Sequence, residues 1–297
     1  MKRPFHSRMP DIMTADHDPA AIMERSRGVF AAQWQELLCL RRAVLKSADP
    51  DEIHDLRVAS RRFRAVLELF YPFALKGGKV KLRKKIRKLT RMLGALRNLD
   101  EALLFFKAHV RDDVSSKSRL VKALSRLRPE ELKLTVKVLE NFDQRTFSRV
   151  VRKMIAGINE ASIMKRGGAT LPACLSEASL GLYRPIQRLL AVSTAPEQRE
   201  SRHTLRIAIK KMRYFYEIVA TVLDRDYTPF LELLKEYQSL LGRMNDIAVF
   251  ETMIGNLKLP PDERAHAEKV LLAEDRRLLE EFTELIERKP LAYIFIA

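Results

Sequence analysis

Apolar residues recur at spacings of three and four along most of the chain, which is the pattern of amphipathic helices. The pattern is clearest in residues 54–70, HDLRVASRRFRAVLELF, where apolar side chains cover one side of a helix and basic side chains the other. No segment shows a convincing strand pattern. The sequence therefore predicts an all-α fold.

The same pattern occurs a second time in residues 203–219, HTLRIAIKKMRYFYEIV. The matching polar positions are His54 with His203, Arg57 with Arg206, Arg61 with Lys210, Arg62 with Lys211 and Arg64 with Arg213. Because the apolar positions match as well, each copy combines a face that packs into a core with a stripe of positive charge. The repeat predicts two related halves.

Capping signals predict where several helices begin. Asp49 precedes Pro50 and lies three residues before Glu52, which is the form of a capping box. Residues 194–197, Thr-Ala-Pro-Glu, have a similar form ahead of the second copy. We therefore expect the two repeated helices to begin with similar chemistry.

Proline positions predict the last helix of each half. Pro129 and Pro261 are each followed by two acidic residues, which favours a helix N-terminus at both places. We expect the first of these helices to end near Glu160 and the second near Lys289.

A second repeated signature is the Leu-Gly pair at Leu93-Gly94 and Leu241-Gly242. A glycine here either lets two helices approach closely or marks a break, and we expect shorter helices over residues 98–110 and 245–257. Asn98, Asp100 and Asp246 follow these pairs. They either cap the following helix or hold basic side chains in place.

These signals divide the chain into segments. Residues 1–18 read as a disordered leader, and residues 291–297 as a C-terminal tail. The helical region from 19 to 290 falls into a first half, about 19–165, and a second half, about 169–290. A link at Lys165-Arg166-Gly167-Gly168 separates the halves.

The charge of the chain indicates a polyanionic partner. Its 55 Lys and Arg residues against 38 Asp and Glu give a net charge of +17. Between Lys76 and Arg97 there is no acidic residue, and Arg83, Arg87 and Arg91 share one helix face with Lys84 beside them. The partner classes are polyphosphate, nucleic acid and an anionic membrane surface, and a basic protein without a particular partner is the remaining alternative.

Other features narrow the class of protein. Cys39 and Cys174 are isolated, so neither a disulfide framework nor a zinc site is expected. The N-terminus lacks the apolar run of a signal peptide, and no segment has 18 uninterrupted apolar residues. We expect a soluble, cytoplasmic protein with no metal and no cofactor.

The duplicated H-x-L-R-[VI]-A-x-[RK]-[RK]-x-R helices, together with the duplicated Leu-Gly signature, resemble the CHAD family, the conserved histidine α-helical domain. The resemblance implies two antiparallel four-helix bundles related by a pseudo-two-fold axis, with a basic cavity or pore between them. It also implies binding of inorganic polyphosphate, with some members associated with polyphosphate granules. Family members are often joined to a triphosphatase domain with an E-x-E-x-K strand. That strand is absent here, so we expect a standalone domain.

The resemblance also implies which residues contact polyphosphate. In the first half these are His54, Arg57, Arg61, Arg62, Arg64, Arg87 and Arg97, and in the second half His203, Arg206, Lys210, Lys211, Arg213 and Lys235. Lys84 and Arg91 join them because they lie with Arg87 on the basic helix. This chain has Asn98 where the family tends to have an acid after the arginine. For the two histidines, contact with phosphate and orientation of a neighbouring helix are equal alternatives.

The expected function is therefore non-enzymatic binding of inorganic polyphosphate, with location at polyphosphate granules. One alternative is an enzyme that processes polyphosphate or a triphosphate with a metal, which would need metal-binding carboxylates near the phosphates. Another is a nucleic-acid-binding protein, which would need several aromatic residues among the basic positions to hold single strands. The cationic helices lack an exposed apolar face for membrane insertion. No particular oligomeric state follows from the sequence.

Overall fold

The computed structural model describes residues 18–73, 78–109, 118–159 and 170–295. Within these ranges the fold is all-helical, without a strand, as predicted. Its elements are α1 (Pro19–Ser47), α2 (Pro50–Phe70), η1 (Tyr71–Phe73), α3 (Lys79–His109), α5 (Arg119–Glu140), α6 (Gln144–Ala156), α8 (Leu171–Leu190), α9 (Arg199–Leu223), α10 (Thr228–Asn256) and α11 (Pro261–Arg288). The link at 165–168 and almost all of the leader lie outside the described residues.

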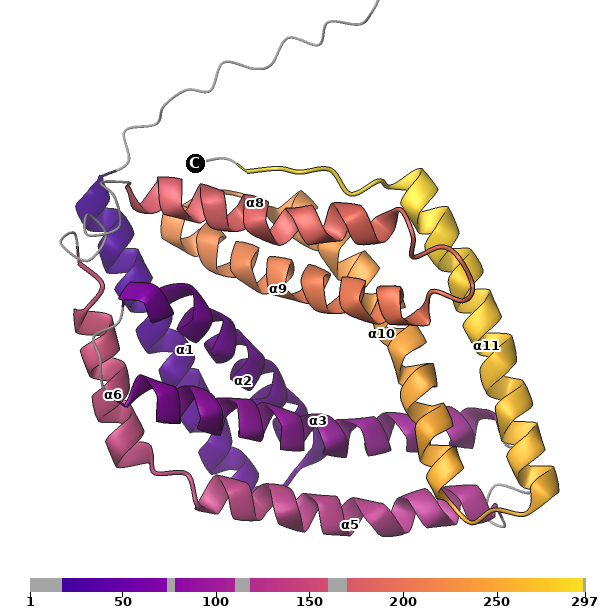
Figure 1. The fold of residues 1–297 in the computed structure, drawn as a ribbon. Helices are drawn as coiled ribbons and strands as arrows, with labels where there is room; N and C mark the ends of the chain where they lie inside the picture. The colour runs from indigo at the N-terminus through magenta and orange to yellow at the C-terminus, as the bar shows by residue number, and fades with distance from the viewer. Residues whose placement is uncertain (1–17, 74–77, 110–117, 160–169, 296–297) are drawn as a thin grey trace, which may run out of the picture.

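The two halves of the sequence lie side by side in the fold (Figure 1). In the first half α1 packs against α2, α2 against α3, and α3 against α5. In the second half α9 packs against both α8 and α10, and α10 packs against α11. The halves meet where α9 packs on α1 and α2 and where α10 packs on α3. The repeated helices α2 and α9 are thus direct neighbours.

The apolar stripes of α2 and α9 form the centre of each half. Leu56 and Phe63 on α2 are fully buried, and so are Leu205 and Met212 on α9. Burial of one large apolar side chain stabilises the fold by about 1.5–3 kcal/mol, so these stripes fix the rotation of both helices. Their basic faces are consequently held in one direction.

The capping prediction is correct for α2 and wrong for α9. The Asp49 side chain accepts hydrogen bonds from the backbone N–H groups of Asp51 and Glu52, with Pro50 in the first turn. Helix α9 begins only at Arg199, and its N-cap residue makes no side-chain capping bond. The preceding turn is held instead by the buried Arg202, whose guanidinium donates to the carbonyls of residues 193, 195 and 196.

The expected breaks after the Leu-Gly pairs are absent. The prediction of separate short helices at 98–110 and 245–257 is therefore wrong. Helices α3 and α10 run without interruption through Gly94 and Gly242. A Cβ added at either glycine would meet no atom within 4 Å, so neither marks a close helix approach. A glycine costs a helix about 1 kcal/mol, which the buried leucines on both sides outweigh. Asn98, Asp100 and Asp246 are therefore not caps.

The last helix is predicted correctly for the second half only. Helix α11 begins at Pro261 and ends at Arg288, close to the expected Lys289. In the first half Pro129 lies exposed inside α5, and a short turn at residues 141–143 separates α5 from α6. Asp143 caps α6 by accepting from the backbone N–H of Thr146 at 3.0 Å. The single helix expected from Pro129 to Glu160 is therefore wrong.

Candidate anion-binding site

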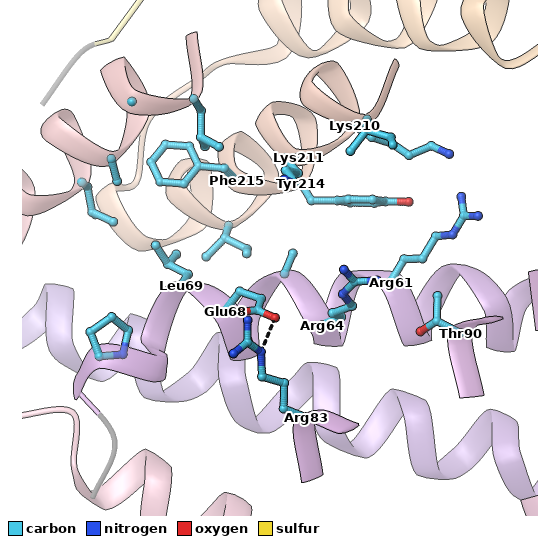
Figure 2. Close-up of a pocket in the computed structure, with 18 of the residues that line it drawn as sticks. Arg61, Arg64, Glu68, Leu69, Arg83, Thr90, Lys210, Lys211, Tyr214 and Phe215 are labelled. Atoms are coloured by element: carbon cyan, nitrogen blue, oxygen red, sulfur yellow. Dashed lines mark hydrogen bonds and ion pairs between the residues drawn. The ribbon is translucent and has the colours of Figure 1, made fainter. Parts of the chain in front are cut away.

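A groove of about 820 Å³ lies among α2, α3, α8 and α9 (Figure 2). Helices from both halves of the sequence form it, because the basic faces of α2 and α9 point toward each other. Its cationic lining consists of Arg61 and Arg64 from α2, Arg83 and Arg87 from α3, and Arg206, Lys210 and Lys211 from α9. Figure 2 shows the ends of Arg61 and Lys210 directed to the same end of the groove.

Five basic side chains lie in or beside this end of the groove, where burial and the charges of their neighbours lower the pKa values of Arg57, Arg206 and Lys210. We call them the cationic cluster: Arg57, Arg61, Arg97, Arg206 and Lys210. Burial, followed by the charges of Arg61 and Arg97, lowers the pKa of Arg57 to about 10. Burial, followed by the charges of Arg61, Arg206 and Arg57, lowers the pKa of Lys210 to about 6. Lys210 is therefore largely uncharged at neutral pH.

Several basic side chains in or beside the groove lack an ion-pair partner. Within the described ranges no carboxylate forms an ion pair with Arg57, Arg61, Arg64, Arg206 or Lys210. The Nε atoms of Arg57, Arg97 and Arg206 are also buried without a hydrogen-bond partner there. An unsatisfied buried donor costs about 1–3 kcal/mol, more when it is charged. The cationic cluster thus places positive charge that these ion pairs do not neutralise at one end of the groove.

Two carboxylates near the groove are already paired with other arginines. Glu68 accepts a hydrogen bond from Arg83 at 2.7 Å. Asp246 from α10 accepts from Arg97 of α3 at 3.0 Å, an ion pair that joins the two halves. Asp246 also raises the pKa of Arg206 and of Lys210, but less than burial lowers it. The net environment remains electropositive.

Two predicted contact residues, Arg62 and Arg213, are instead held by an acidic residue. Glu217 on α9 forms an ion pair with Arg213 at 2.7 Å and with Arg62 on α2 at 3.5 Å. Arg213 also donates to the side chain of Gln238 at 2.8 Å. Neither arginine lines the groove. Glu217 thus links Arg62 on α2 to Arg213 on α9.

The repeated histidines have different surroundings. His203 is exposed, and its Nδ1 lies 2.7 Å from the side-chain oxygen of Asn245 on α10. This contact matches the orienting alternative for His203. His54 is also exposed, and neither histidine lines the groove. In the repeat Arg97 takes the place of Asn245, so the same contact is not available to His54.

The remaining predicted residues lie on the protein surface. Lys84, Arg91 and Lys235 are exposed and are not part of the groove lining. Arg87 is exposed as well but lines the groove, where its charge lowers the pKa of Arg64. The basic face of α3 therefore continues outward from the groove.

The sequence does not predict the wall that α8 contributes. This wall contains Leu171, Cys174, Leu175, Ala178 and Leu182, and Tyr214 and Phe215 of α9 lie beside it. No charge or repeat in residues 171–190 distinguishes α8 from an ordinary core helix. Tyr214 carries a detectable signal, since an aromatic residue occupies the basic side of α9.

The described residues offer neither a metal site of clustered ligands nor a membrane-spanning helix. They contain no group of three or more His, Cys, Asp or Glu side chains arranged to hold a metal ion. Among the described helices, none is both long and apolar enough to cross a membrane.

Comparison with known proteins identifies the fold. The chain is similar to the CHAD domain from the plant Ricinus communis, with 20% identity over 97% of this chain and 94% of that chain and a TM-score of 0.63. It is also similar to PptA from Streptomyces chartreusis, with 15% identity over 90% and 98% of the two chains and a TM-score of 0.64. No curated protein matches it. The family model described as the CHAD domain matches residues 28–255, which is more than half of the sequence, and the chain therefore belongs to the CHAD domain family.

Proposed function

We propose that this protein binds inorganic polyphosphate in the groove and does not hydrolyse it. The observation that carries the proposal is the cationic cluster, in which burial and mutual repulsion lower the pKa values of Arg57, Arg206 and Lys210. A bound polyanion would offset this repulsion with its negative charge. Membership of the CHAD family supports the same ligand.

Polyphosphate suits this chemistry better than a ligand with bases. Its repeating phosphates carry about one negative charge each and offer only oxygen acceptors, so recognition needs charge density and donor geometry. Arg61 and Arg206 supply planar forks for two oxygens, and Lys210 supplies a point charge once it takes up a proton in the complex. By this proposal the protein is cytoplasmic and associates with polyphosphate granules.

Binding should raise the thermal stability of the protein. At a polyphosphate concentration about 100 times the Kd, we expect roughly 2.7 kcal/mol of stabilisation and a midpoint about 5 °C higher at low salt. The logarithm of the affinity should fall with the logarithm of salt concentration, with a slope of about −0.7 per neutralised phosphate. Differential scanning fluorimetry and fluorescence anisotropy measure both. An unchanged midpoint at saturating ligand would contradict a preformed site.

Duplex DNA provides the control for general polyanion binding. A duplex about 20 Å across should compete poorly for a groove of this size, whereas unlabelled polyphosphate of equal charge should compete fully. A preference for DNA at fixed salt would favour the nucleic-acid alternative.

The protein should release no phosphate from polyphosphate. We base this on Glu68 and Asp246, which neighbour the groove but are paired with Arg83 and Arg97 and so are not free to hold a catalytic metal. The measurement is phosphate release from polyphosphate with Mg²⁺ or Mn²⁺, with a known phosphatase as the positive control. Release that depends on protein and metal would establish the enzymatic alternative.

A further inference from the structure

The groove has an apolar part that a polyphosphate chain cannot use. Leu171, Leu175 and Ala178 of α8 line it together with Leu69 of α2 and Phe215 of α9. Figure 2 shows Leu69 and Phe215 toward one end of the groove and Arg61 and Lys210 toward the other, with Tyr214 between them. The lining therefore changes from apolar to cationic along the groove.

This combination is typical of small-molecule sites. Such sites have volumes of about 300–1,000 Å³ and are lined mainly by apolar side chains, with a few polar groups that fix orientation. The groove volume of about 820 Å³ lies in this range. Its apolar residues lie on helices, and Leu175 and Phe215 are almost fully buried in the core, so the wall is rigid. The outer atoms of a polyphosphate chain are oxygens, so it gains no hydrophobic stabilisation by covering such a surface.

We propose that the groove also binds a single-chain amphiphile with a phosphate or diphosphate head, as in an alkyl or prenyl phosphate. The head contacts Arg61, Arg206 and Lys210, and the hydrocarbon chain lies against α8 and Phe215. The head shares cations with the proposed polyphosphate site, but the hydrocarbon chain uses a separate surface. The two ligands are therefore mutually exclusive at the head position.

Gly181 provides a substitution that acts on the apolar part alone. It lies on α8 in the groove lining, and a Cβ added there would meet no atom within 4 Å. A leucine at this position would occupy the space assigned to the hydrocarbon chain. Gly28 on α1 is the matched control, because its added Cβ also meets no atom within 4 Å and it does not line the groove. Both residues lie inside helices, where replacement of glycine favours the helix.

The test is calorimetric titration of the full chain with methyl, butyl and octyl phosphate below the micelle concentration, and with long-chain polyphosphate. Each buried methylene should tighten binding by up to about fourfold, so octyl phosphate should bind at least about tenfold more tightly than butyl phosphate. Gly181→Leu should remove this gain and leave the affinity for polyphosphate within about twofold. Gly28→Leu should change neither. Equal affinities for butyl and octyl phosphate, or a gain that persists in Gly181→Leu, would overturn the proposal.

Cys174 gives a second measurement that needs no change in the groove. It lines the apolar part and is partly exposed, and Cys39, the exposed cysteine on α1, can be replaced by serine. In Cys39→Ser, octyl phosphate should slow the reaction of Cys174 with a maleimide, and butyl phosphate should slow it less. Equal protection by the two would place the hydrocarbon chain elsewhere and overturn the proposal.

Two further outcomes distinguish the amphiphile site from polyphosphate binding and from binding to a membrane surface. If the native protein does not bind polyphosphate but binds octyl phosphate more tightly than butyl phosphate, the proposed function is overturned and the amphiphile site is supported. The second outcome concerns vesicles of phosphatidylcholine that contain phosphatidic acid. If the native protein and Gly181→Leu sediment equally with these vesicles and free octyl phosphate does not bind, the ligand is a membrane surface and the inference is overturned.

Discussion

Polyphosphate should bind more tightly as the pH falls from about 8 to about 6, by up to about tenfold per pH unit. Lys210 causes this dependence, because burial and the charges of Arg61, Arg206 and Arg57 lower its pKa to about 6 in the free protein. Asp246 is the acidic group that acts in the opposite direction. A bound polyanion neutralises the surrounding arginines and raises the pKa of Lys210 toward its ordinary value.

The direction of the effect follows from proton uptake. At pH values between the Lys210 pKa of about 6 in the free protein and its higher pKa in the complex, Lys210 is uncharged before binding and charged afterwards. Binding then takes up as much as one proton, so a higher proton concentration favours the complex. Below about pH 6 Lys210 is charged in both states, and its contribution to the pH dependence ends.

Calorimetry in two buffers of different ionisation enthalpy measures this proton uptake directly. Long-chain polyphosphate is the appropriate ligand, because its titrating end groups are few. Lys210→Met should abolish the uptake at pH 7–8 and should bind no more tightly at pH 6 than at pH 8. The double variant His54→Gln, His203→Gln should retain the dependence of the native protein. Loss of the dependence in the histidine variant, with retention in Lys210→Met, would assign it to the histidines.

The same pKa shift affects the stability of the free protein. The folded state binds the Lys210 proton more weakly than the unfolded chain, whose lysine has a pKa of about 10.5. Stability should therefore increase as the pH rises from about 6 toward 10.5, and Lys210→Met should flatten this part of the profile. Chemical denaturation at several pH values measures it.

The sequence alone predicts how the cationic faces are built, and the reason is physical. The apolar positions of residues 54–70 and 203–219 fix which side of each helix is buried, so the opposite side carries Arg57, Arg61, Arg206 and Lys210. The repeat implies similar packing for both copies. Burial of apolar area dominates helix orientation, which makes this part of the site readable from periodicity.

Side-chain partners and helix packing explain what the sequence does not predict. Glu217 pairs with Arg62 on another helix as well as with Arg213 on its own, and the pattern within residues 54–70 does not specify a partner on α9. Arg202 replaces the expected helix cap with hydrogen bonds to carbonyls in the turn before it. The apolar wall of α8 depends on how one helix packs across another, which a pattern within residues 171–190 cannot specify.

Substitution of Arg61 and of its neighbour Arg62 should have effects of different size on binding and of opposite sign on stability. Arg61 lines the groove, and its charge lowers the pKa values of Arg57, Arg64 and Lys210. Arg61→Gln should weaken polyphosphate binding by about 10–150-fold, since a charged hydrogen bond contributes about 1.5–3 kcal/mol. It should also stabilise the free protein by about 0.5 kcal/mol, because a like-charge pair one helical turn apart costs a few tenths.

Arg62→Gln is the matched control, with the same chemistry one residue away. Arg62 lies outside the groove and pairs with Glu217 at 3.5 Å and with Glu36 at 3.9 Å. These partly exposed pairs contribute about 0–1 kcal/mol, so the variant should be slightly less stable and should bind polyphosphate within about threefold of the native protein. Anisotropy titration and thermal melting at low salt give both quantities for each variant. Both substitutions remove one positive charge, but only Arg61→Gln removes a side chain that faces the groove. Equal losses of affinity in the two variants would therefore mean that net charge, rather than the cationic cluster, attracts the polyanion.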